Sequence, residues 1–157
     1  MMQAWRIGTD TSAYQAHDMA GTGAKITGGR WNSAGNALVY ASSSRALACL
    51  ETVVHLGAGA LPLNRYLVQI DIPENVWKVR TVLALPKAPV GWDALPEGAV
   101  SLNFGDNWLS SGASAIVLVP SIVVPEEQNI LINPTHPDAA LIKATKVRKW
   151  LYDSRLK

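Results

Sequence analysis

Residues 28–40, GGRWNSAGNALVY, combine flexible backbone with side chains that bind ligands. Two glycines precede Arg30 and Trp31, and an apolar run ends at Tyr40. Glycine lets the backbone turn sharply or approach a ligand closely, and a guanidinium binds phosphate or carboxylate through paired hydrogen bonds. The stretch predicts a ligand-binding loop, or only a turn with a surface arginine, a core tryptophan and a half-buried strand tyrosine.

Glu51 is the acidic residue with the most unusual setting. In a helix, at about 100° per residue, it falls on the apolar face that Leu47, Leu50 and Val54 define. A carboxylate on such a face is costly unless it is paired or hydrogen-bonded. Two interpretations stay open: a structural ion pair with an arginine, or a carboxylate placed to stabilise a developing positive charge.

The remaining nucleophiles and metal ligands fit no standard motif. Ser121 follows Pro120 in the apolar stretch VPSIVVP, where its hydroxyl could simply satisfy the backbone, and no GxSxG surrounds it. The three histidines are scattered, and only His55 shares a helix with Glu51. HExxH is absent and Cys49 is the single cysteine, so we expect no metal site and no internal disulfide.

Composition excludes several classes of function. The net charge of +2 and the lack of a basic, aromatic-rich surface argue against direct nucleic-acid binding. GTGAKITGG matches neither the dinucleotide fingerprint nor the phosphate-binding P-loop. The sequence shows no signal peptide and no apolar run of about 18 residues. We therefore predict a cytoplasmic protein with no membrane segment.

The elements that must position these residues follow a mixed, strand-rich order. This order favours an α+β fold in a single domain over a doubly wound sheet. A serine at 43 or 44 can cap a helix that Gly57 ends. The other expectations are strands at 4–7, 37–42, 65–73, 75–82, 114–125 (broken at Pro120) and 129–133, a helix at 101–112, a helical turn followed by a loop across 10–29, a loop at 84–98, and an undecided helix or strand within 141–156.

Several stretches occur together in one order: AWRIG, GGRWNSAGNALVYAS, RALACLETVVHL, GDNWL, VPSIVVPEEQNILINPTHPD and YDSRL. In this combination the chain resembles the RES-domain toxins of bacterial toxin–antitoxin pairs, named for an Arg, a Glu and a Ser. The resemblance implies one RES domain over residues 1–157. It also implies a compact mixed-sheet core similar to ADP-ribosyltransferases of the diphtheria-toxin type, with a strand as the last segment.

The resemblance further implies the activity and the partners. The main expectation is cleavage of NAD+ at the nicotinamide–ribose bond, which depletes cellular NAD. One alternative is transfer of ADP-ribose to a cellular protein, and a second is a catalytically silent module that binds a nucleotide or a partner. The implied partner is an Xre-like helix-turn-helix antitoxin that blocks the cleft, with the toxin as a homodimer or within a larger complex.

Residue roles follow from the matching positions. Arg30 would hold the NAD phosphates or ribose, Glu51 would bond the ribose 2′-hydroxyl beside the reacting carbon, and Ser121 would orient the nicotinamide ribose. The oxocarbenium-like ribose formed on cleavage carries positive charge, which a fixed carboxylate in a dry cleft stabilises. The NAD-binding set is completed by Tyr40 at the nicotinamide end and by Trp31 and Asn129 in motif positions.

Overall fold

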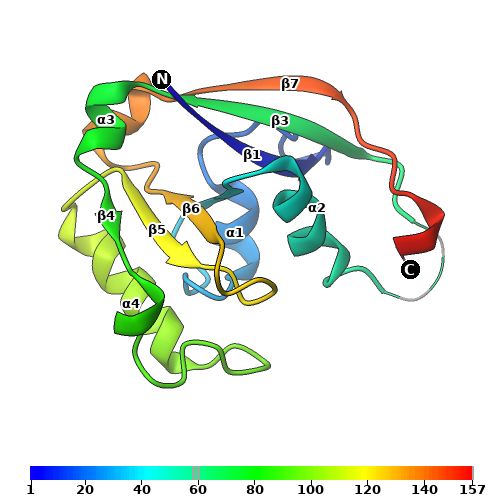
Figure 1. Ribbon diagram of the computed structural model, residues 1–157. Coiled ribbons are helices and arrows are strands. Elements are labelled where there is room, and N and C mark those ends of the chain that lie inside the picture. The colour runs from blue at the N-terminus through cyan, green and yellow to red at the C-terminus, as the bar shows by residue number, and fades with distance from the viewer. Residues whose placement is uncertain (58, 60, 157) are drawn as a thin grey trace.

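A computed structural model describes residues 1–57, 59 and 61–156, and shows a mixed sheet with short helices around it (Figure 1). The sheet has the strand order β4-β5-β6-β2-β1-β3-β7, and only the β4–β5 pair is parallel. This arrangement confirms the α+β fold class. The strands are β1 (Met2–Thr9), β2 (Val39–Ser42), β3 (Arg65–Ile72), β4 (Thr81–Val82), β5 (Ile116–Pro120), β6 (Gln128–Ile132) and β7 (Lys143–Lys149).

Short helices close the connections between strands. The α-helices are α1 (Thr22–Thr27), α2 (Arg45–Val53), α3 (Glu74–Lys78) and α4 (Ala99–Ser111), and 3₁₀ turns cover Leu85–Lys87, Pro137–Leu141 and Ser154–Leu156. Strand β5 is buried at every position, as its continuous apolar sequence predicts. Helix α4 ends at Gly112, whose positive φ of 62° is the left-handed conformation that glycine adopts without strain.

Helix α2 carries Glu51 and lies against β1 (Figure 1). As predicted, Ser44 caps it: the Ser44 hydroxyl accepts a hydrogen bond from the backbone N–H of Leu47 at 3.1 Å. The expected end at Gly57 was wrong. The helix stops at Val53 because the next backbone N–H groups, beginning at His55, bond three residues back and tighten the chain into a turn.

The helix packs through a different face from the one the sequence suggested. Leu50 and Val54 were expected to be buried, yet they are 37% and 50% exposed. The buried positions of α2 are Leu47, Ala48, Cys49 and Val53. Of these, Ala48, Cys49 and Val53 pack with residues of β1 and β3. Glu51 is therefore part-buried at the border of the helix contact, facing a cavity, rather than inside an apolar stripe.

Three further expectations are decided by the structure. The segment 10–29 begins as a loop and ends in α1, the reverse of the predicted order. Residues 75–82 were expected to form a strand, but only the end of the segment does, as β4, while residues 75–78 belong to α3. Helix α3 begins after Pro73 with acidic Glu74 in its first turn, both favourable at a helix N-terminus. The undecided last segment contains the strand β7, as the family resemblance implied.

Candidate active site

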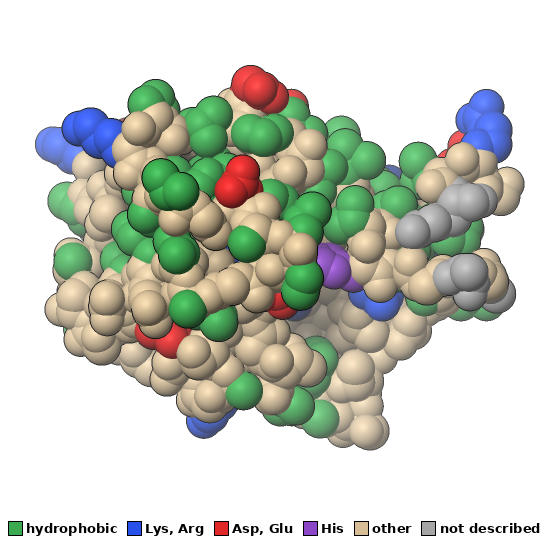
Figure 2. All heavy atoms as spheres, turned by 90° about the horizontal axis from the view of Figure 1, so that it is seen from below, with side chains coloured by type: hydrophobic (Ala, Val, Ile, Leu, Met, Phe, Trp, Pro, Cys, Tyr) green, Lys and Arg blue, Asp and Glu red, His purple; other side chains and the backbone are tan. Residues whose placement is uncertain are grey.

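A cavity of about 980 Å³ opens on the face of the molecule shown in Figure 2, where charged side chains and a histidine border a hollow. Its walls come from β1, α1, β2, α2 and residues 28–31, which we call the GGRW segment. Asn129 of β6 lies at one end. The volume lies at the upper end of the range for small-molecule sites. Of the predicted site residues, Arg30, Trp31, Tyr40, Glu51 and Asn129 line this cavity.

The Glu51 carboxylate is held by two side-chain donors on one oxygen. Its Oε1 accepts from the Ser121 hydroxyl at 2.6 Å and from the Asn129 amide Nδ2 at 3.0 Å. No described residue donates to its Oε2, and no described cation forms a salt bridge with it. The interpretation of Glu51 as an arginine ion pair was therefore wrong, and the carboxylate keeps a free oxygen at the cavity.

Ser121 lies behind Glu51 and not in the cavity wall. It is 0% exposed, and its hydroxyl accepts from the backbone N–H groups of Val123 and Val124, both at 3.1 Å. The Ser121 hydroxyl therefore has a structural role, because it satisfies the backbone after Pro120, and it also donates a hydrogen bond to the candidate site residue Glu51. With no accessible surface, Ser121 cannot contact a ligand in the cavity directly.

The GGRW segment packs against the loop at 88–97. The Arg30 Nη1 donates to the backbone oxygens of Trp92 and Ala94, each at 2.9 Å. Trp31 is 2% exposed, and its ring lies 6.1 Å from that of Trp92 in a stacked arrangement. The stacking partner of Trp31 is thus a core tryptophan rather than a ligand, while Arg30 keeps its remaining N–H groups for the cavity.

Tyr40 is fixed by the same segment. Its hydroxyl donates to Asn32 Oδ1 at 2.6 Å and accepts from the backbone N–H of Trp31 at 3.0 Å. Burial raises the pKa of Tyr40 above its ordinary value, so the phenol stays protonated and its ring forms part of the cavity wall. Gly29 permits this contact, because a Cβ there would lie 2.6 Å from the Tyr40 hydroxyl oxygen.

Asp106, in the GDNWL motif, anchors the turn that follows the GGRW segment. It accepts from the backbone N–H and the hydroxyl of Ser33, and from the amide of Asn36 at 3.0 Å. Burial on its own would raise the pKa of Asp106, but these hydrogen bonds outweigh it and the pKa lies below its ordinary value. Asp106 therefore supports the site without lining it.

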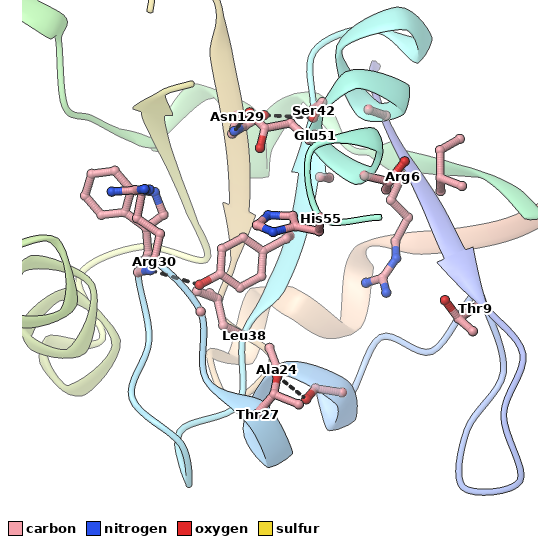
Figure 3. A pocket seen from close by; sticks show the side chains of 18 of the residues that line it. Arg6, Thr9, Ala24, Thr27, Arg30, Leu38, Ser42, Glu51, His55 and Asn129 are labelled. Carbon is pink, nitrogen blue, oxygen red and sulfur yellow. Dashed lines mark hydrogen bonds between the residues drawn. The ribbon is translucent and has the colours of Figure 1, made fainter. Parts of the chain in front are cut away.

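Two cavity arginines were missed by the sequence reasoning. Arg6 of β1 forms no hydrogen bond or salt bridge with any described residue, and Figure 3 shows its guanidinium directed into the space between His55 and Thr9. Burial lowers its pKa, and Asp18 opposes this, but a guanidinium stays charged at neutral pH. Arg65 of β3 also lines the cavity, and its buried Nε has no partner. The available signal was strand alternation, which separates Arg6 from the buried Trp5 and Ile7.

Two kinds of feature are absent from residues 1–57, 59 and 61–156. No helix in this part of the chain is long and apolar enough to cross a membrane. No group of three His, Cys, Asp or Glu side chains lies close enough together to hold a metal ion.

The fold is shared with a solved structure. It matches a chain in the crystal structure of the M. tuberculosis MbcT–MbcA toxin–antitoxin complex with a TM-score of 0.61, covering 94% of this chain and 84% of the other. At 16% identity this likeness shows a shared fold.

The family follows from sequence comparison. The RES domain model matches residues 3–154, and the chain belongs to the RES domain family. It is similar to the "Prs ADP-ribosylating toxin" of Sphingobium sp. strain YBL2, with 62% identity over 152 residues that cover 97% of this chain and 94% of the relative. It is 36% identical to "Toxin Res" of Yersinia enterocolitica over 92% of this chain and 93% of that relative, and 36% identical to "Toxin Res" of Pseudomonas putida over 99% of both. The chain is thus a RES-type toxin and an enzyme, and the family implies NAD+ as its substrate.

Proposed function

We propose that this toxin transfers ADP-ribose from NAD+ to a cellular protein. The observation that carries the proposal is the Glu51 carboxylate, held through Oε1 with Oε2 free at a cavity that also contains unpaired arginines. The 62% identical relative, named for ADP-ribosylation of Prs, favours transfer over the simple NAD+ cleavage that the sequence suggested first. Prs is accordingly the first acceptor to test.

The chemistry needs one fixed negative charge and no paired acid. The bond between ribose C1′ and the nicotinamide nitrogen breaks, its electron pair goes to that nitrogen, and nicotinamide leaves as a neutral molecule. Positive charge develops on C1′ and the ring oxygen. Glu51 stabilises this charge from a preorganised position. The acceptor then bonds to C1′ and loses a proton.

The cationic residues of the cavity suit the pyrophosphate of NAD+. Arg6 is a charged group with no hydrogen-bond partner among the described residues, so an anion in the cavity would satisfy it. Arg65 also lines the cavity and adds positive charge to it. The free N–H groups of Arg30 add to this set, while its Nη1 holds the loop at 88–97. Tyr40, Trp31, Asn129 and Ser121 then shape or support the nicotinamide end.

An antitoxin is proposed as the partner that restrains this activity in the cytoplasm. The shared fold with a chain of a toxin–antitoxin complex and the similarity to relatives named "Toxin Res" support the pairing. An Xre-like helix-turn-helix protein is the type that the family resemblance implies. Co-expression of such a protein should restore growth of cells that produce the toxin.

The direct test mixes the purified chain with NAD+ labelled in the ADP-ribose portion, with and without Prs. Free nicotinamide and label on protein are both measured, alongside Glu51→Gln and, as a matched control, Glu97→Gln, another carboxylate that lines the cavity. Nicotinamide release with label on Prs, lost in Glu51→Gln only, supports transfer. Nicotinamide release without label on Prs or on proteins of a cell extract would indicate hydrolysis of NAD+ instead of transfer. No nicotinamide release would refute NAD+ as the substrate.

A further inference from the structure

Two mostly buried polar residues lie beside Glu51 where β2 pairs with β6, and both border the cavity. Ser42 and Asn129 are direct partners in the antiparallel register, which places their side chains next to each other on one face of the sheet. They are only 3% and 9% exposed. Ser42 Oγ donates to Asn129 Oδ1 at 2.8 Å, and Asn129 Nδ2 donates to Glu51 Oε1 at 3.0 Å. Figure 3 shows the three residues together at one end of the cavity.

The Asn129 amide has two different ends, and this makes its orientation matter. Its oxygen only accepts hydrogen bonds and its nitrogen only donates them. The Ser42 hydroxyl holds the oxygen end, so the donor end faces the carboxylate. Without that hydroxyl, the buried Asn129 oxygen would have no donor, which is costly in free energy. This cost would favour rotation of the amide, and the rotated amide would place its oxygen against Glu51.

Both contacts on the carboxylate converge on a single oxygen. Asn129 and Ser121 donate to Oε1 alone, so the plane of the carboxylate is fixed and Oε2 is left toward the cavity. We propose that Ser42, acting through Asn129, is a positioning residue that fixes the orientation of the Glu51 carboxylate, with one oxygen held by the protein and the other directed to the substrate. This inference rests on the proposed role of Glu51 in NAD+ cleavage.

The test uses two variants of nearly equal shape. Ser42→Thr keeps a hydroxyl and Ser42→Val replaces it with a methyl group, so their difference isolates the donor. Ser43→Ala is the matched control, because Ser43 is exposed and only its backbone N–H is bonded, to Gln128. We expect Ser42→Val to lower kcat for nicotinamide release roughly tenfold relative to Ser42→Thr, because one hydrogen bond is lost. KM for NAD+ should stay within about twofold, because Ser42 is only 3% exposed although it borders the cavity.

A second readout does not depend on turnover. Carbon NMR of the Glu51 carboxyl at one fixed pH reports the hydrogen bonds that the carboxylate accepts, and we expect its chemical shift to move in Ser42→Val but not in Ser42→Thr. Equal kcat and equal carboxyl chemical shifts in these two variants would overturn the positioning role, as would a rise in KM with kcat unchanged. A chemical shift that moves while the parent releases no nicotinamide would support the positioning of Glu51 and refute the proposed function instead.

Discussion

Replacing Glu51 with glutamine isolates the charge of the carboxylate from its shape. The glutamine side chain has the same length, and its amide oxygen can accept the hydrogen bonds that Ser121 and Asn129 now donate to Oε1. The variant should therefore fold with little change in thermal stability. What it loses is the negative charge at the cavity.

The size of the effect follows from Coulomb's law. A full charge about 4 Å from the developing positive charge contributes about 4 kcal/mol at an effective dielectric constant of about 20. Removing it should lower kcat for nicotinamide release by roughly a thousandfold. KM for NAD+ should change much less, because that positive charge exists only in the transition state.

The assay is initial-rate release of nicotinamide by parent, Glu51→Gln and Glu97→Gln proteins of equal thermal stability. Glu97 lines the same cavity, and no described residue holds its carboxylate by a hydrogen bond. Glu97→Gln should keep kcat within about threefold of the parent, because its carboxylate is not fixed at the reacting carbon. A Glu51→Gln variant that keeps more than about a tenth of the parental kcat, or a Glu97→Gln variant that loses as much, would refute the assignment of Glu51.

Three further perturbations test the surrounding structure. Arg6→Gln should raise KM for NAD+ by roughly tenfold or more, since a charge-assisted hydrogen bond contributes about 1.5–3 kcal/mol. The control Arg148→Gln, on the exposed β7, should leave KM unchanged. Equal KM values for the two variants would refute the binding of the NAD+ pyrophosphate by Arg6. Gly105→Ala places a Cβ against the Trp31 carbonyl oxygen and should lower the free energy of unfolding by about 3 kcal/mol. This corresponds to a Tm decrease of about 6–12 °C. The control Gly57→Ala, with no atom near its Cβ, should leave Tm within about 2 °C of the parent. Asp106 has a lowered pKa in the folded state, so it contributes stability above its ordinary pKa and this contribution disappears as pH falls through the folded value. Asp106→Asn should therefore lower Tm at neutral pH and converge with the parent in acid, and a constant Tm difference across the range would contradict this.

Local signals in the sequence were sufficient for elements whose ends are fixed by their own residues. Ser44 caps α2, and Pro73 ends β3, because capping and the missing proline N–H act within a few residues. The same β-branched content that identifies β5 was misleading at 75–82. There residues 75–78 form α3 and only Thr81–Val82 form a strand, because burial in the tertiary structure, and not local propensity, decides between helix and strand.

The candidate site was predictable in its residue types but not in its connections. Periodicity pointed to Glu51 as an unusual carboxylate, yet it gave the wrong buried face, because the helix contact is set by β1. Ser42 carries no motif signal of its own. Its position opposite Asn129 depends on the register between strands that are far apart in the chain, and side-chain spacing within one segment contains no such information.

The hydrogen bonds of Glu51 also have a consequence for synthesis of the toxin. Glu51 is held by residues 70 and 78 positions further along the chain, and β2 gains its β6 partner only at residues 128–132. A ribosome that has delivered α2 must add many more residues before the carboxylate is oriented, and synthesis at about 5–20 residues per second makes this a delay of several seconds. On the proposed role of Glu51, the nascent chain is inactive until β6 has been synthesised, and this interval would let an antitoxin already present bind the toxin as it completes its fold.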